Sequence, residues 1–190
     1  MIPRFGPTPA SVLGDIALPG SAAVCIPDAT RPLAPAVALQ TLRRHIEGNM
    51  QVVVGLGLHR RMRPAERARI EAWNPLEHDP DDTIPTATID GIPGGVFTPV
   101  GRMDRAIGIG VVELHQYAGV SGGHKAVSVG CGSRATIAAL HHRDRVTAPG
   151  VRVGAVDGNP FRQAVDDLGH RSRRLQVLRA SVCSCQVLAM

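Results

Sequence analysis

Aromatic residues and lysine are scarce in this chain of 190 residues. Phe, Trp and Tyr make up 3% of the sequence, so a hydrophobic core has to be built mainly from Ala, Val, Leu and Ile. Among 21 basic residues lysine occurs once, at Lys125, and all the others are arginine. This bias is typical of a GC-rich genome, and it singles out Lys125 before any motif is considered.

Long apolar runs are also missing. No segment approaches the roughly 20 apolar residues that a membrane-spanning helix requires, and the first fifteen residues lack the apolar core of a signal peptide. The four cysteines are scattered except for Cys183 and Cys185, which is typical of reduced thiols rather than a disulfide framework. These two have no third and fourth ligand nearby for a structural zinc ion. We therefore expect a cytoplasmic protein without a membrane partner.

The net charge of +5 comes largely from the end of the chain. Residues 1–161 carry 16 basic and 14 acidic side chains, whereas residues 162–190 carry five and two. Proteins that bind nucleic acids usually concentrate basic residues on one face and add aromatic residues for stacking. Because the main body is nearly neutral, we expect no nucleic-acid partner.

Short apolar runs alternate with helical patterns along the chain. The sequence predicts strands over 21–27, 50–58, 95–99, 106–114 and 151–156, and helices over 33–47, 63–73, 133–142 and 159–169. Parallel strands need crossover helices, so this alternation predicts an α/β fold with a Rossmann-like, partly parallel sheet and flanking helices in a single domain. Ligands of such sheets bind beyond the carboxyl ends of the strands.

The motif DATRP, residues 28–32, follows the first predicted strand. Asp28 can accept a hydrogen bond from a ribose hydroxyl group or a backbone N–H, and Arg31 can bind a carboxylate with two parallel hydrogen bonds. The alternative is an Asx-type turn in which Asp28 caps the following helix. Spacing alone favours the turn.

His59 lies in the segment GLGLHR, residues 55–60, at the end of the second predicted strand. The segment fails the G-x-G-x-x-G pattern of a dinucleotide-binding loop, since Arg60 occupies the third glycine position. A histidine here is a candidate general base near neutral pH. The alternative is a structural or merely exposed residue.

The segment HQYAGVSGGHK, from His115 to Lys125, is the richest in candidate functional residues. Its small residues let the backbone approach a ligand closely and offer N–H donors to an anion. It is not a Walker A loop, because Lys125 is followed by Ala126 instead of Ser or Thr. Lys125 is either an ordinary surface charge or, if burial lowers its pKa, a nucleophile or a covalent attachment point.

His141 and His142 end the helix predicted over 133–142. A neutral imidazole is a common metal ligand, but a histidine at this position also interacts favourably with the helix dipole. The acidic segment 78–82 could bind a cation, although a solvated loop is the favoured interpretation.

In combination, these segments resemble the N-terminal domain of the nickel-dependent lactate racemase family. DATRP is similar to its D-x-T-R-P loop, GLHR to its G-x-H-R element, and residues 115–125 to its H-x-x-A-G-x-S-G-G-x-K segment. The spacing of ten from His115 to Lys125, and of sixteen from Lys125 to His141, agrees with the family pattern. GNPFRQAVDD is similar to its G-N-P helix start.

The resemblance implies a nickel-pincer nucleotide, the Ni(II)-pyridinium-3,5-bisthiocarboxylate mononucleotide. It implies that Lys125 attaches this cofactor covalently through a thioamide and that His141 is the protein ligand to nickel. Arg31 would also bind the carboxylate group of the substrate. The cofactor-binding residues implied in this way are Asp28, Ala29, Thr30, Arg31 and Lys125.

The implied reaction is the racemisation or epimerisation of a lactate-type 2-hydroxy acid by proton-coupled hydride transfer. His59 and His115 would be the acid–base pair, one on each face of the substrate. Removing the hydroxyl proton eases loss of the hydride from the neighbouring carbon, and two opposed bases suit inversion of that centre. The implied partners are a small 2-hydroxy acid and the enzymes that synthesise the cofactor.

The resemblance covers residues 7–169, which corresponds to the N-terminal half of the family. The stretch 129–132 reads VGCG where the family has a proline-glycine pair after the lysine. Residues 170–190 form an atypical basic tail, and the family's opening segment and C-terminal domain have no counterpart. We therefore expect residues 1–169 to be a cofactor-binding domain that is incomplete as a lone chain. The alternative is a truncated, non-catalytic remnant that binds the nucleotide cofactor.

Overall fold

The computed structural model describes residues 17–31, 33–170, 176–183 and 186–189, the last two ranges by their backbone alone. One large sheet organises these residues, with the strand order β10-β9-β6-β1-β2-β3. All neighbouring strands are parallel except β10 and β9. The strands are β1 (Ala22–Pro27), β2 (Met50–Gly55), β3 (Leu76–Glu77), β6 (Arg105–Val111), β9 (Gln176–Cys183) and β10 (Gln186–Ala189).

The central strands are buried on both faces, which explains their nearly continuous apolar sequences. In register, Val24 of β1 lies between Val52 of β2 and Ile107 of β6. These three side chains share one core with Leu39 and Leu42 of α2 (Ala36–His45). The alternation along each strand then sends the next residue of β1 to the opposite face of the sheet.

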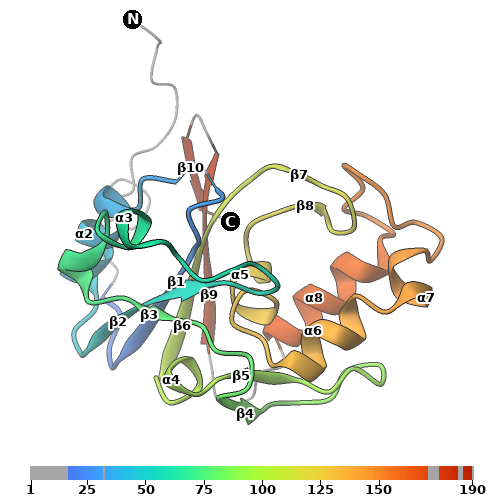
Figure 1. Ribbon diagram of the computed structural model, residues 1–190, viewed down its shortest axis with the longest axis horizontal. Coiled ribbons are helices and arrows are strands. Elements are labelled where there is room, and N and C mark those ends of the chain that lie inside the picture. The colour runs from blue at the N-terminus through green and yellow to red at the C-terminus, as the bar shows by residue number, and fades with distance from the viewer. Residues whose placement is uncertain (1–16, 32, 171–175, 184–185, 190) are drawn as a thin grey trace, which may run out of the picture.

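Helices cover both faces of the sheet (Figure 1). α2 and α3 (Pro64–Arg67) lie on one side, and α5 (Lys125–Ser128), α6 (Arg134–Leu140) and α8 (Pro160–His170) lie on the other. On this second side, Ala23 and Cys25 of β1 pack in a core with Val127 of α5. The predicted Rossmann-like α/β fold is therefore confirmed.

Smaller elements surround this framework. β4 (Thr83–Pro85) and β5 (Gly95–Phe97) pair antiparallel below the sheet in Figure 1, and β7 (Leu114–His115) pairs with β8 (Gly119–Val120) at the upper right. Three short helices complete the description, namely η1 (Glu71–Trp73), α4 (Thr98–Gly101) and α7 (Arg143–Val146).

Several predicted elements are shorter than the sequence indicates. The strand predicted over 50–58 ends at Gly55, two residues before Gly57 adopts a positive φ of 56°. The helix predicted over 63–73 is divided into α3 and η1, and β5 gives way to α4 at Thr98. The early end of β2 leaves the segment that carries His59 outside the sheet.

The strand predicted over 151–156 is wrong. This segment forms turns, with positive φ values of 92° at Gly150 and 77° at Gly154. Val153 and Val156 are exposed rather than buried, so their apolar side chains do not belong to a sheet. The segment instead contacts β8, where the Gly154 N–H donates to the Gly119 carbonyl oxygen.

The sheet also extends further than the sequence predicts, because the backbone of β9 pairs in parallel with the whole of β6. The division at residue 169 stays a prediction, although α8 continues through His170. Within the described residues, no helix combines the length and apolar character needed to cross a membrane.

Candidate functional site

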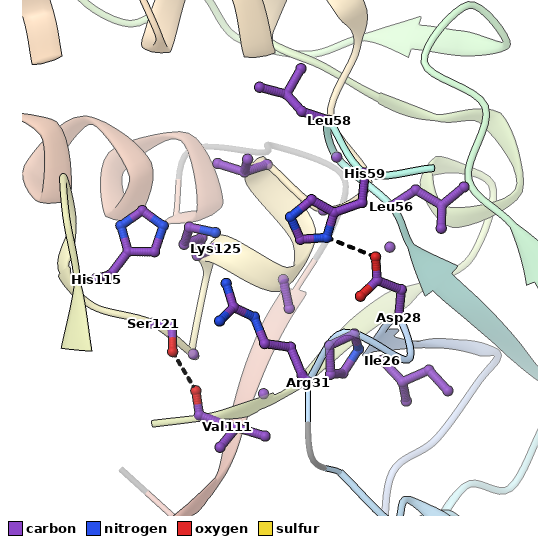
Figure 2. Close-up of a pocket in the computed structure, with 18 of the residues that line it drawn as sticks. Ile26, Asp28, Arg31, Leu56, Leu58, His59, Val111, His115, Ser121 and Lys125 are labelled. Carbon is purple, nitrogen blue, oxygen red and sulfur yellow. Dashed lines mark hydrogen bonds and ion pairs between the residues drawn. The ribbon is translucent and has the colours of Figure 1, made fainter. Parts of the chain in front are cut away.

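A pocket of about 470 Å³ lies beyond the carboxyl ends of β1, β2 and β6. Six of the predicted site residues line it, and they come from five separate stretches of the chain. Figure 2 labels all of them except His141. Ala29 and Thr30 lie on the same turn as Asp28 but are exposed and are not part of the lining. The predicted residues that line the pocket are Asp28, Arg31, His59, His115, Lys125 and His141.

Asp28 is buried, and its carboxylate links the DATRP motif to His59 of the GLGLHR segment. Its Oδ1 accepts hydrogen bonds from the Thr30 hydroxyl group at 2.6 Å and the Thr30 backbone N–H at 3.0 Å, which is an Asx-type turn. Its Oδ2 lies 2.7 Å from Nδ1 of His59. The prediction that Asp28 caps the next helix is wrong, since Pro35 precedes the first turn of α2.

The contact with Asp28 fixes the orientation of the His59 ring. A carboxylate can only accept, so Nδ1 of His59 carries the hydrogen and Nε2 keeps its lone pair. The His59 side chain is 45% exposed while that of Asp28 is 5% exposed. A buried anion therefore holds an accessible imidazole, as a general base requires.

Arg31 forms an ion pair that the sequence does not indicate. Its Nη1 lies 2.9 Å from Oε2 of Glu113, and both side chains are about one-third exposed, at 33% and 30%. A guanidinium group carries five N–H donors, so the remaining donors stay available to an anion. Glu113 thus holds one side of the guanidinium group while the pocket keeps a positive charge.

His115 has its Nδ1 directed at its own loop. The backbone N–H groups of Tyr117 and Ala118 lie 3.2 and 3.1 Å from this nitrogen, so Nδ1 accepts and Nε2 carries the hydrogen. Burial, and then the positive charges of Lys125 and Arg31, lower the pKa of His115 to about 4. His115 is therefore neutral at pH 7, with Nε2–H as the group available to a ligand.

The glycine-rich loop before Lys125 depends on residues without side chains. Gly122 adopts a φ of 91°, in the region that L-residues rarely occupy. Its Cα is so close to β6 that a Cβ at Gly110 would lie 2.8 Å from it. Ser121 is buried here and donates its hydroxyl hydrogen to the Val111 carbonyl oxygen at 2.6 Å. The glycines thus let the loop lie against the end of β6 and bring Lys125 into the pocket.

Lys125 begins α5 and its partly buried side chain lines the pocket. Burial, and then the charge of Arg31, lower its pKa from 10.5 to about 8, against the opposing effect of Asp28. Figure 2 shows its side chain directed into the same space as those of Arg31, His59 and His115. The sole lysine of the chain is therefore a partly buried amine inside the pocket rather than an ordinary surface charge.

His141 follows the last residue of α6 and is oriented by its own helix. Its Nδ1 lies 2.8 Å from the Ile137 carbonyl oxygen, so Nδ1 donates and Nε2 keeps a lone pair. The ring packs against Tyr117 and Phe161, with ring centroids 6.0 and 5.5 Å away. A ring held in this way, with Nε2 unbonded, suits a metal ligand. The hydrogen bond from Nδ1 to the Ile137 carbonyl oxygen resembles those that orient metal-bound histidines in other proteins.

α8 holds the loop that carries His115 and Lys125. Asn159 donates to the Tyr117 carbonyl oxygen at 2.8 Å, and Asp166 lies 3.3 Å from Nδ1 of the buried His124. Arg162 completes this contact, with its Nε 2.7 Å from the Asp166 carboxylate. The helix start predicted from GNP is therefore confirmed, and its contacts with Tyr117 and His124 hold the loop of the site in place.

Other candidates from the sequence lie outside the pocket. His142 is exposed, and Asp81 of the acidic segment pairs with Arg134. His78 is buried and donates from Nε2 to the Gly132 carbonyl oxygen at 2.8 Å. Over the described residues, no group of three or more His, Cys, Asp or Glu is arranged to hold a metal ion.

Comparison with known proteins agrees with this arrangement. A sequence model of the lactate racemase N-terminal domain matches residues 7–154. The chain belongs to the lactate racemase N-terminal domain family. The match includes the segments that carry Asp28, His59 and Lys125. It ends before α8, so Asp166, the partner of His124, falls outside the matched region.

Individual relatives extend the match to sequence and fold. A lactate racemase from Thermoanaerobacterium thermosaccharolyticum is 26% identical over 149 residues, which cover 70% of this chain and 35% of that protein. The structure of the lactate racemase apoprotein from the same organism superposes with a TM-score of 0.75 at 20% identity, covering 89% of this chain and 44% of that one. A crystal structure of a Thermotoga maritima protein superposes with a TM-score of 0.68 at 19% identity, covering 91% of this chain and 49% of that one. The chain therefore spans between about one-third and one-half of these relatives.

Proposed function

We propose that this chain binds a nickel-pincer nucleotide and serves the racemisation or epimerisation of a small 2-hydroxy acid. The observation that carries the proposal is the convergence of two histidines, an arginine and a reactive lysine on one pocket, with His141 beside them. Membership of the family supports a racemase-type reaction, and the relative named lactate racemase supports a lactate-type acid.

The residues of the pocket fit the proposed cofactor. His141 offers one nitrogen ligand, and a nucleotide that brings its own sulfur and carbon donors needs few others from the protein. Lys125 offers an amine for covalent attachment, and Asp28, Ala29, Thr30 and Arg31 lie on one polar turn that can hold the nucleotide. When bound, the nickel-pincer nucleotide supplies a hydride acceptor and donor.

His59 is the residue we assign to the hydroxyl proton. Its Nε2 takes this proton from the substrate, and the carboxylate of Asp28 stabilises the resulting imidazolium from 2.7 Å on the other side of the ring. Loss of the proton places negative charge on the substrate oxygen, which favours departure of the hydride from the neighbouring carbon. Asp28 is therefore a positioning residue for His59.

His115 takes the second position of the acid–base pair in this proposal. Its Nε2 is the ring atom left for the substrate, since Nδ1 accepts two backbone hydrogen bonds. Arg31 binds the substrate carboxylate with the donors that Glu113 does not use. Holding that carboxylate fixes the position of the reacting carbon relative to both histidines.

The test is turnover by the chain produced together with the cofactor-synthesis enzymes. A 2-hydroxy acid deuterated at C2 should racemise and keep its deuterium, because a hydride moves without exchange with solvent. The variant His59→Ala should bind the cofactor but lose turnover. Loss of deuterium to water, or turnover unchanged in His59→Ala, would refute the mechanism. Cofactor binding without turnover in the wild-type chain would instead support the non-catalytic binding protein.

A further inference from the structure

We propose that, before a cofactor is attached, Lys125 captures small 2-oxo acids as a reversible imine while Arg31 holds their carboxylate group. The inference rests on the pocket of the unloaded chain. It shares with the proposed function the binding of a carboxylate by Arg31. It also uses the Lys125 nitrogen that the proposed function assigns to cofactor attachment. Its test uses neither the cofactor nor turnover, so the two proposals can fail separately.

The amine of Lys125 has the properties of a nucleophile toward a carbonyl group. Among the described residues, no carboxylate forms an ion pair with it, although Asp28 acts on it from a longer distance. Burial and the neighbouring Arg31 lower the pKa of this amine to about 8. About one-tenth of the amine is then unprotonated at pH 7, compared with roughly 0.03% of an ordinary lysine.

The charges of the pocket favour an anion. Arg31 and Lys125 are both cations that line it, while each oxygen of the Asp28 carboxylate is already bonded, one to Thr30 and the other to His59. Glu113 is bonded to a single nitrogen of Arg31. An incoming carboxylate can therefore bind the free side of the guanidinium group by charge-assisted hydrogen bonds.

A 2-oxo acid matches this pair of cations, because its electrophilic carbon is directly bonded to its carboxylate. Figure 2 shows the guanidinium group of Arg31 and the Lys125 side chain directed into one space, with His59 and His115 beside them. A carboxylate held by Arg31 would thus bring the neighbouring carbonyl carbon to the amine. A neutral ketone of the same size would lack this anchor.

The reaction needs no oxidant or reductant. The Nζ lone pair of Lys125 attacks C2, the π electrons of the C=O bond move to oxygen, and this oxygen takes a proton to give a carbinolamine. The nitrogen loses one proton, and the hydroxyl group takes up a second proton and leaves as water while the nitrogen lone pair forms the C=N bond. Loss of the remaining N–H proton gives the neutral imine, so amine and ketone become imine and water. His59 Nε2 can accept a proton and His115 Nε2–H can donate one within the same pocket.

This capture would compete with cofactor attachment at the same nitrogen. The proposed racemisation passes through a 2-oxo acid, so the compound captured by Lys125 belongs to the same class as the intermediate of that reaction. A chain exposed to 2-oxo acids would load cofactor more slowly than one without them.

The test incubates the cofactor-free chain with pyruvate and sodium cyanoborohydride, a hydride donor that reduces an imine to a stable secondary amine. Peptide mass mapping should place the resulting 1-carboxyethyl group on Lys125. Since Lys125 is the sole lysine, the α-amine of Met1 is the only other primary amine and serves as an internal reference. Acetone, a ketone without a carboxylate, should label Lys125 roughly 10- to 100-fold more slowly than pyruvate.

The variant Arg31→Gln should lower the preference of Lys125 for pyruvate over acetone to that of the Met1 α-amine, which reports the intrinsic reactivity of the two ketones. Comparing the two ketones on one variant cancels the change that the substitution also causes in the Lys125 pKa. Arg60→Gln is the matched control, because Arg60 pairs with Glu66 outside the pocket and its loss should leave the preference intact. Equal labelling by the two ketones in the wild-type chain, or label confined to Met1, would overturn the proposal.

Discussion

The acidity of Lys125 can be tested by titrating one side chain. Its pKa of about 8, against 10.5 for a free lysine, raises the unprotonated fraction at pH 7 by roughly 300-fold. The shift comes first from burial and then from Arg31, while Asp28 opposes it. Arg31→Gln should therefore raise the pKa of Lys125 toward 10.5, and Asp28→Asn should lower it below 8.

The assay is the rate of acylation by trace acetic anhydride between pH 6 and pH 11, followed at the Lys125 peptide. A lysine in a short free peptide, labelled in the same tube, corrects for hydrolysis of the reagent. The labelling rate should reach half its maximum near pH 8 in the wild-type chain and at higher pH in Arg31→Gln. A midpoint above pH 10, or one that does not move in Arg31→Gln, would refute the role of burial and of the neighbouring cation.

Three further predictions concern stability and substrate binding. Acid should destabilise the fold below about pH 6.5, because burial lowers the pKa of both His115 and His78, so the unfolded chain binds protons that the folded chain excludes. Each histidine should lower the free energy of unfolding in urea by up to about 1.4 kcal/mol per pH unit. A free energy of unfolding that stays constant from pH 7 to pH 5 would contradict this. Gly169→Ala should destabilise by about 1–3 kcal/mol in thermal unfolding, because the new Cβ would lie 2.6 Å from the His124 ring, and a stabilised variant would show that this contact relaxes. Glu113→Gln should raise KM for a 2-hydroxy acid several-fold with little change in kcat, because it frees the pocket arginine from its fixed position, and an effect on kcat alone would oppose this role.

Local sequence patterns predict much of the fold and of the site. The apolar runs of β1, β2 and β6 are continuous because these strands are buried on both faces, so they stand out from the surrounding sequence. Asp28, His59 and His115 follow strand ends in the sequence, and parallel strands bring such ends to one edge of a sheet. The topology then accounts for the pocket they share.

The missed features depend on contacts between distant parts of the chain. Glu113 meets Arg31 across 82 positions, and no local motif indicates which carboxylate will pair with which arginine. The contact between His124 and Asp166 likewise forms only when α8 packs against α5. The error at 151–156 has the opposite cause, because an apolar run there belongs to exposed turns set by glycines with positive φ.

The strongest single test of the account is the intact mass of the chain after co-production with the cofactor-synthesis enzymes. The account predicts an added mass the size of the cofactor, located on Lys125, together with stoichiometric nickel. The variant Lys125→Ala should lack the added mass. An unmodified wild-type mass, or an adduct that persists in Lys125→Ala, would contradict the assignment of this pocket as a site of covalent cofactor attachment.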